Sequence, residues 1–206
     1  MKAILMSIRS HHLANILNGD KTIELRKRFP KDFRGWVYLY CTKGKPYLTR
    51  IYGEWDLTKY GCEESPSGNV RTVNGKVVCR FWVDNVEEIV LEDISGNEQY
   101  NIVFENHTTK ETEDKLKSMC LTFDEFLDYH LKSLAHKKDG FVVSKAIHIS
   151  KLEIFDKPKE LGEFYYYKKR LIDCGMDCPP YFDKVKTQVH KAPQSWQYIY
   201  IKEELL

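Results

Sequence analysis

The residues whose types and spacing best suit chemistry stand together at positions 19–26, in the run Gly-Asp-Lys-Thr-Ile-Glu-Leu-Arg. From Lys21 onward apolar and charged residues alternate, which predicts a strand with isoleucine and leucine on one face and Glu24 and Arg26 on the other. Glu24 and Arg26 then lie ~7 Å apart on that face. A carboxylate beside a guanidinium stays ionised, and the two together offer an acceptor and a donor to a base edge or a phosphate.

Lys21 stands at the start of this predicted strand. A lysine there can donate to a phosphate or, when desolvated, act as a general base. The same spacing is also that of a surface ion pair on a solvated strand, and spacing alone leaves both interpretations open. Lys21 and Glu24 are therefore candidate catalytic residues, and all three charged residues are candidate ligand-binding residues.

The elements that must position this segment are predicted directly before it. Residues 2–9 form an almost continuous apolar run of strand length, which is typical of a strand buried on both faces. Ser10 can cap a helix of about two turns, and Gly19 stands where a left-handed C-cap is needed. The first residues of the chain are therefore predicted to form a strand, then a short helix, then the charged strand.

Further elements are predicted by the same rules, and together they indicate an α+β fold class. Thr122 and Glu125 form a capping box that starts a helix, and a strand over 146–155 loses its alternation near Ser150, which indicates a bulge. Strands outnumber helices without alternating regularly with them, so we expect a mixed β-barrel with several covering helices. We expect one domain over residues 1–206, with an insertion around 92–140. The other predicted elements are strands at 36–42, 76–83 and 196–201 and a helix at 161–171.

Two further groups of residues have a predicted place. His130 and His148 lie on apolar faces and are predicted to be core histidines. Tyr165, Tyr166 and Tyr167 cannot all face one way on a predicted helix. At least one of these tyrosines is therefore expected at the surface, where it would serve as a contact.

The charge of the chain is concentrated near its start. Residues 1–50 hold eleven Lys or Arg against three Asp or Glu, whereas the whole chain carries a net charge of only +2. Trp36, Tyr38, Tyr40 and Tyr47 are interleaved with these cations. Such a surface suits phosphates and stacked bases, although lysines that only solvate strand edges give the same pattern.

Several classes of protein are not expected. No apolar run approaches the ~20 residues of a membrane span, and the first residues do not form a secretory signal, so we expect no membrane partner and a cytoplasmic protein. The six cysteines are scattered, which favours reduced thiols. Cys174, Cys178 and His190 are a weak candidate zinc set, because zinc ligands usually come in tighter pairs and number four. We predict no metal and no cofactor.

The run Ser7-Ile-Arg9, a short helix and then Gly-Asp-Lys-Thr-Ile-Glu-Leu-Arg resembles the ASCH family, whose members have a PUA-like β-barrel and are associated with RNA metabolism. The likeness covers roughly the first 45 residues and is supported loosely by Ala-Pro-Gln-Ser-Trp-Gln-Tyr at 192–198. It implies a pocket between the barrel and the N-terminal helix. Lys21, Glu24 and Arg26 would line this pocket, together with Ser7 and Arg9 from the neighbouring strand.

The resemblance also implies two kinds of chemistry. Some small ASCH relatives are amidohydrolases acting on acylated cytidine, with a lysine and a threonine three residues later, and this chain keeps Lys21 but has Glu24 in place of that threonine. Other relatives are linked to ribonuclease action, in which Lys21, Tyr38 and Tyr40 would serve. Ser195 and Trp196 could close the pocket, since a tryptophan face stacks on a base, although Trp196 could equally be a core residue.

The leading hypothesis is therefore an ASCH-type, PUA-like domain that binds RNA or a modified nucleotide. Its candidate ligand-binding residues are Ser7, Arg9, Lys21, Glu24, Arg26, Tyr40, Ser195 and Trp196. The first alternative is a hydrolase of a modified nucleoside or of an RNA phosphodiester, with Lys21 as activating base and Glu24 as its partner. The second alternative is a phage-type adaptor that binds a protein partner.

Overall fold

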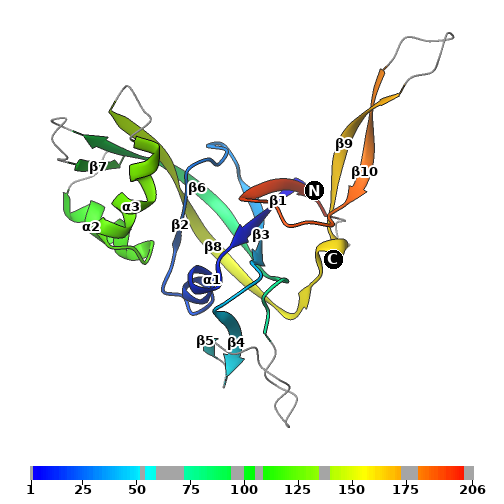
Figure 1. The fold of residues 1–206 in the computed structure, drawn as a ribbon, viewed down its shortest axis with the longest axis horizontal. Coiled ribbons are helices and arrows are strands. Elements are labelled where there is room, and N and C mark those ends of the chain that lie inside the picture. Colours follow the sequence, from blue (N-terminus) through cyan, green and yellow to red (C-terminus); the bar gives the residue numbers. More distant parts are fainter. Residues whose placement is uncertain are drawn as a thin grey trace. The chain divides into compact units, whose positions relative to one another are not determined.

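The computed structural model shown in Figure 1 describes residues 2–51, 54–58, 72–93, 100–104, 109–134, 140–172 and 181–201. Within these ranges the fold is mixed α+β, with three α-helices and a large, mostly antiparallel sheet, so the predicted fold class is confirmed. The chain divides into two compact units. The first unit comprises Met1–Leu13, Gly35–Arg80 and Glu153–Leu206, and the second comprises Ala14–Arg34 and Phe81–Leu152.

The first unit is built around β1 (Lys2–Ile8), which pairs in parallel with β3 (Gly35–Cys41) and antiparallel with β11 (Trp196–Tyr200). Ile4, Leu5 and Met6 are fully buried, as the unbroken apolar run predicts. A short 3₁₀ helix (Leu161–Glu163) precedes two antiparallel strands, β9 (Tyr165–Ile172) and β10 (Tyr181–Gln188). Two more strands, β4 (Tyr47–Ile51) and β5 (Glu54–Thr58), form a separate small sheet.

The second unit packs two helices on a sheet. Strand β2 (Ile23–Arg26) pairs antiparallel with β8 (Phe141–Lys159), and β7 (Tyr100–Phe104) pairs antiparallel with β6 (Val77–Asp93). The helices are α2 (Thr109–Ser118) and α3 (Phe123–Leu134), while α1 (Ser10–Leu17) precedes β2. One apolar cluster joins all these elements except α1, through residues that include Ile23, Ile89, Ile102, Leu116, Phe126 and Ala146. The two long strands, β6 and β8, run through both units.

Local signals in the sequence are reproduced at several element ends. Gly19 follows α1 with φ +86°, the left-handed conformation of a C-cap. The Thr122 N–H donates to Glu125 Oε2 (2.9 Å) and the Glu125 N–H donates to Thr122 Oγ1 (3.2 Å), which confirms the capping box. Lys151 has φ +46°, an irregular conformation next to the predicted bulge at Ser150.

Two predictions about the sheet are wrong. Residues 165–172 form strand β9 rather than a helix, because the tyrosine-rich run favours extended backbone and pairs residue by residue with β10. The sheet path ends at β10 and at β2, and in the described part of the chain these two strands pair with β9 and β8 alone. A barrel needs hydrogen bonds between its first and last strands, so this sheet is open.

The described helices include none that is both long enough and apolar enough to span a membrane.

Substitution Thr122→Ala tests the capping box. The change leaves the Glu125 N–H without its side-chain acceptor, so we expect the free energy of unfolding to fall by about 1 kcal/mol. Urea denaturation followed by circular dichroism measures this value. Glu125→Gln keeps the reciprocal geometry and should cost less, and equal losses in both variants would contradict the capping role.

Candidate functional site

Three of the predicted site residues lie together in the second unit. Lys21 Nζ donates to the Met119 carbonyl oxygen (2.5 Å) and lies 3.5 Å from Glu24 Oε2. Arg26 Nε lies 2.9 Å from Glu24 Oε1. The exposed fractions of the Lys21, Glu24 and Arg26 side chains are 2%, 6% and 14%. The interpretation as an ion pair on a solvated strand is therefore wrong for Lys21 and Glu24.

The burial of Lys21 follows from where α2 ends. The last carbonyl groups of a helix have no partner inside the helix, and they form the negative end of its dipole. At the end of α2, the Ser118 carbonyl accepts from the Thr22 N–H (2.9 Å) and the Met119 carbonyl accepts from Lys21 Nζ. The two residues before β2 thus donate hydrogen bonds to carbonyl groups at the end of α2. One of them is a lysine, which supplies the positive charge that a helix C-terminus favours.

The buried cluster carries two cations and one carboxylate, so its formal charge is positive. Lys21 is enclosed between the Met119 carbonyl and Glu24, whereas Arg26 is the member that reaches furthest toward solvent. Glu24 fixes the orientation of the Arg26 guanidinium from one side. A guanidinium carries five N–H donors, and its planar shape suits phosphates and carboxylates.

Tyr129 of α3 adds an aromatic ring beside these cations. Its side chain is 41% exposed, and Lys27 Nζ lies 4.8 Å from the ring centroid. Partial burial raises the pKa of Tyr129, while the Arg26 charge and a hydrogen bond from the Lys27 backbone oppose that rise. We call Arg26, Lys27 and Tyr129 the Arg26 patch. Sequence reasoning missed Tyr129, although its position off the apolar face of the predicted helix is a signal for exposure.

His130 fixes α3 on the sheet. Its Nδ1 lies 2.7 Å from the Phe126 carbonyl oxygen, and its Nε2 lies 2.5 Å from Ser144 Oγ on β8. Because a carbonyl only accepts, Nδ1 carries the proton and the Ser144 hydroxyl donates to Nε2. The ring is fully buried, which confirms the predicted core histidine, and burial lowers its pKa. The ring of Tyr129 is positioned by the same histidine, since the Tyr129 and His130 rings pack edge to face with their centroids 4.9 Å apart.

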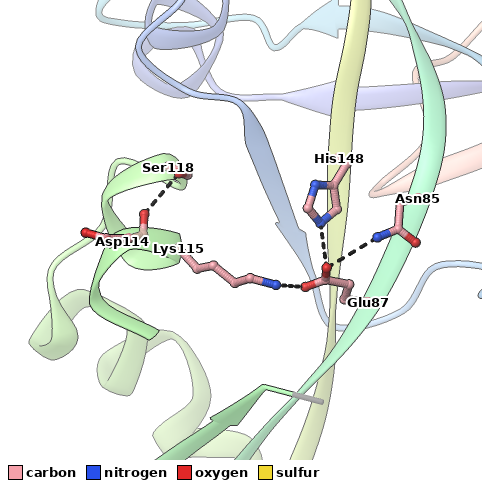
Figure 2. Close-up of polar contacts among 6 residues, drawn as sticks. All are labelled: Asn85, Glu87, Asp114, Lys115, Ser118 and His148. Atoms are coloured by element: carbon pink, nitrogen blue, oxygen red, sulfur yellow. Dashed lines mark hydrogen bonds and ion pairs between the residues drawn. The ribbon is translucent and has the colours of Figure 1, made fainter. Parts of the chain in front are cut away.

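A second polar cluster fixes α2, as Figure 2 shows. The Glu87 carboxylate of β6 forms an ion pair with Lys115 of α2, lies 3.2 Å from His148 Nε2 of β8, and accepts from Asn85 Nδ2 at 3.3 Å. His148 is partly exposed, so its predicted place in the core is wrong. Sequence reasoning missed Glu87 and Lys115 because residues from three distant segments meet here and no local spacing marks them.

The first unit holds the remaining predicted site residues, and Ser7 is tied there to the segment before β11. Its Oγ donates to the Pro193 carbonyl oxygen (2.6 Å) and its N–H donates to the Ser195 carbonyl oxygen (2.9 Å). The same segment lines an open hollow of about 320 Å³, which Pro193 and Gln197 border among others. Gln197 Nε2 is buried there and has no hydrogen-bond partner among the described atoms. Ser195 itself is exposed.

Arg9, Tyr40 and Trp196 have different surroundings within this unit. Arg9 is exposed, whereas Tyr40 is buried in the apolar cluster that includes Leu5 and Ile199, and burial raises its pKa. Trp196 is half-buried and packs edge-on against a neighbouring tyrosine on β11. The predicted site residues therefore fall into two groups, one in each unit. Their predicted roles in binding stay predictions.

The described residues contain no cluster of three side chains suited to a metal ion. Cys174 and Cys178, the weak zinc candidates, lie outside the described residues. Within the described ranges, Cys41, Cys79 and Cys120 are free thiols, and burial raises the pKa of Cys41 to about 12. Such a thiol stays protonated and unreactive near neutral pH.

Among known proteins, only solved structures gave matches to this chain. No family model matches the chain. No curated protein matches it either. Among solved structures, the crystal structure of ASCH from Zymomonas mobilis is similar, with 12% identity, a TM-score of 0.48, and coverage of 98% of this chain and 89% of that one. A tyrosine-to-phenylalanine mutant of the same protein has 12% identity, a TM-score of 0.43, and coverage of 78% and 77%. A likeness at this level assigns neither ligand nor activity.

Substitution Lys21→Met tests the buried cluster. It removes the cation from the Met119 carbonyl and from Glu24, so we expect the free energy of unfolding to fall by about 3 kcal/mol. Lys117→Met, at an exposed position that forms an ion pair with Asp114 along α2, should cost less than ~0.5 kcal/mol. Urea denaturation of both variants measures the difference. Similar losses would show that Lys21 has no special role in stability.

The lowered pKa of His130 predicts a pH dependence. The unfolded chain, with a histidine pKa of ~6.5, binds a proton in a range where folded His130 stays neutral. The free energy of unfolding should therefore decrease as the pH falls below ~6.5. Urea denaturation between pH 5 and 8 measures this slope. His130→Gln should flatten it, whereas His190→Gln, at an exposed position, should leave it unchanged; an unaltered slope in His130→Gln would contradict the assignment.

Proposed function

We propose that this chain binds single-stranded RNA, or a nucleotide of the same chemistry, at the Arg26 patch. The observation that carries the proposal is the position of Lys27 over the exposed ring of Tyr129, a side chain on which the charge of Arg26 also acts. Nucleotides offer a negative phosphate and a flat base. Cations beside an aromatic ring match both parts.

The phosphate is bound by Arg26. Its guanidinium is already oriented by Glu24, so little side-chain freedom is lost when an anion binds. The cluster of Lys21, Glu24 and Arg26 has one more cation than carboxylate, which favours a negative ligand. Because Arg26 is only 14% exposed, its interaction with an anion is less screened by water than that of a fully exposed arginine.

The base stacks on Tyr129. The ring is held by α3, which His130 fixes to Ser144, so the stacking surface is rigid. Lys27 Nζ donates to Ser133 Oγ (2.8 Å) and lies over the same ring, which adds a cation to the site. Base–aromatic stacking tolerates every base, so the proposed site has little sequence preference.

In this proposal Lys21 and Glu24 position Arg26 rather than react. A general base must reach the proton it removes, and Lys21 Nζ is enclosed by the Met119 carbonyl and Glu24. Tyr40, considered for a ribonuclease, packs in an apolar cluster, and Tyr38 accepts a hydrogen bond from Arg80 Nη1 at 3.0 Å. These contacts favour binding over turnover.

Binding of a fluorescent 12-nucleotide single-stranded RNA over a salt series tests the proposal. Tyr129→Ala should weaken binding about tenfold, because ~1–3 kcal/mol of stacking is lost, while Tyr129→Phe should keep most of the affinity. Arg26→Gln should weaken binding and reduce the slope of log K against log salt by about 0.7, the value for one phosphate contact.

Lys117→Gln serves as the matched control, because it removes an exposed positive charge from α2 in the same unit. Its affinity should stay close to that of the unaltered chain. The proposal is contradicted if Arg26→Gln and Tyr129→Ala bind RNA as this control does.

A further inference from the structure

Strands β9 and β10 form a two-stranded ribbon that leaves both of its faces in solvent. From Tyr166 outward, β10 is the strand that pairs with β9 in the described part of the chain, and Figure 1 shows the two side by side. Every described side chain over 167–171 is exposed. An isolated two-stranded ribbon is at best marginally stable in water. This ribbon therefore has a surface available for a partner over residues 167–171 of β9.

One face of the ribbon concentrates positive charge. Lys169 and Lys184 are directly opposite each other across the two strands, so their side chains share a face, and Lys186 lies on the same face two residues further along β10. Neither the Lys169 nor the Lys184 ammonium group has an ion-pair or hydrogen-bond partner among the described residues. Like charges placed opposite each other destabilise a sheet. An anion bound between them would remove this repulsion.

Apolar side chains alternate with these lysines on the same face. Leu171 and Phe182 are directly opposite each other and are 54% and 69% exposed. On the other side of the lysine pair, Tyr167 is 45% exposed, and its ring packs edge-on against Tyr200 at 4.7 Å. We call this surface the ribbon face; it comprises Tyr167, Lys169, Leu171, Phe182, Lys184 and Lys186.

The opposite face of the ribbon differs in charge and in composition. There Arg170 is directly opposite Asp183, so a cation faces a carboxylate, and Lys168 is opposite Val185. The positive charge is therefore greater on the ribbon face, which has three lysines and no carboxylate, than on the opposite face. This contrast provides a matched control within the same two strands.

We infer that the ribbon face is a second binding surface, one that takes single-stranded nucleic acid along the ribbon. The inference rests on the proposed function and adds to it a surface in the first unit. The three lysines bind phosphates, and the rings of Tyr167 and Phe182 stack on bases. Residues of one face recur every ~7 Å along a strand, so cations and rings follow one another at intervals suited to a repeating polyanion with flat bases. An acidic protein segment would match the lysines but leave both rings without a flat partner.

The experiment compares two double variants of the full chain in binding a fluorescent 12-nucleotide single-stranded RNA over a salt series. Lys169→Gln with Lys184→Gln should weaken binding about tenfold or more and reduce the salt slope by about 1.4, the value for two phosphate contacts. Lys168→Gln with Arg170→Gln removes the same charge from the opposite face and should change the affinity less than threefold. Circular dichroism verifies that both variants fold.

The contribution of the rings is measured separately. Tyr167→Ala with Phe182→Ala should weaken RNA binding about tenfold, while binding of inorganic polyphosphate, which has no bases, should stay unchanged. Equal weakening of both ligands, or none of either, overturns the role in stacking. Tighter binding of poly-glutamate than of RNA overturns the choice of nucleic acid and favours an acidic protein partner.

The outcomes separate this inference from the proposed function. The first outcome is that the two charge-removing double variants, one on each face of the ribbon, bind RNA alike while Arg26→Gln still weakens binding. The ribbon face is then wrong and the Arg26 patch stands. If Lys169→Gln with Lys184→Gln alone loses affinity while Arg26→Gln does not, the ribbon face stands and the Arg26 patch is wrong. If the unaltered chain binds no RNA, both proposals are overturned.

Discussion

The contact between Lys21 and the end of α2 is the interaction on which the candidate site depends. The Lys21 ammonium group satisfies the Met119 carbonyl and neutralises Glu24, which leaves the other carboxylate oxygen of Glu24 to orient Arg26. A buried carboxylate without such partners would cost several kcal/mol. The helix that supplies the carbonyl is itself held by the ion pair between Lys115 and Glu87. The orientation of Arg26 thus depends on a series of contacts that starts at the ion pair between Glu87 and Lys115.

Two polar clusters in the second unit fix the helices that stand next to β2. Glu87 fixes α2, His130 fixes α3, and each helix then contributes a group next to β2. Helix α2 provides the carbonyl for Lys21, and α3 provides Tyr129. Two helices and one short strand therefore combine to present a rigid group of side chains, which a solvated strand alone could not do.

The sequence predicts well those features that depend on neighbours in the chain. The buried strand at 2–8, the glycine cap at Gly19 and the capping box at Thr122 follow from local patterns and are confirmed. The helix predicted at 161–171 is wrong because the tyrosine-rich run adopts its extended conformation by pairing with β10, a partner that lies further along the chain. The burial of Lys21 could not be predicted from its neighbours in the chain, since the carbonyl it binds belongs to Met119, within the expected insertion at 92–140.

The opposed lysines of the ribbon face give ionic strength two contrary effects on this protein. Dissolved salt screens the repulsion between Lys169 and Lys184, so it should tighten the pairing of β9 and β10 in the unliganded chain. The same salt competes for the ammonium groups and weakens attraction to any polyanion. Added salt therefore increases the order of the ribbon and decreases its affinity for a polyanion. At low salt, a bound polyanion would itself neutralise the two opposed lysines.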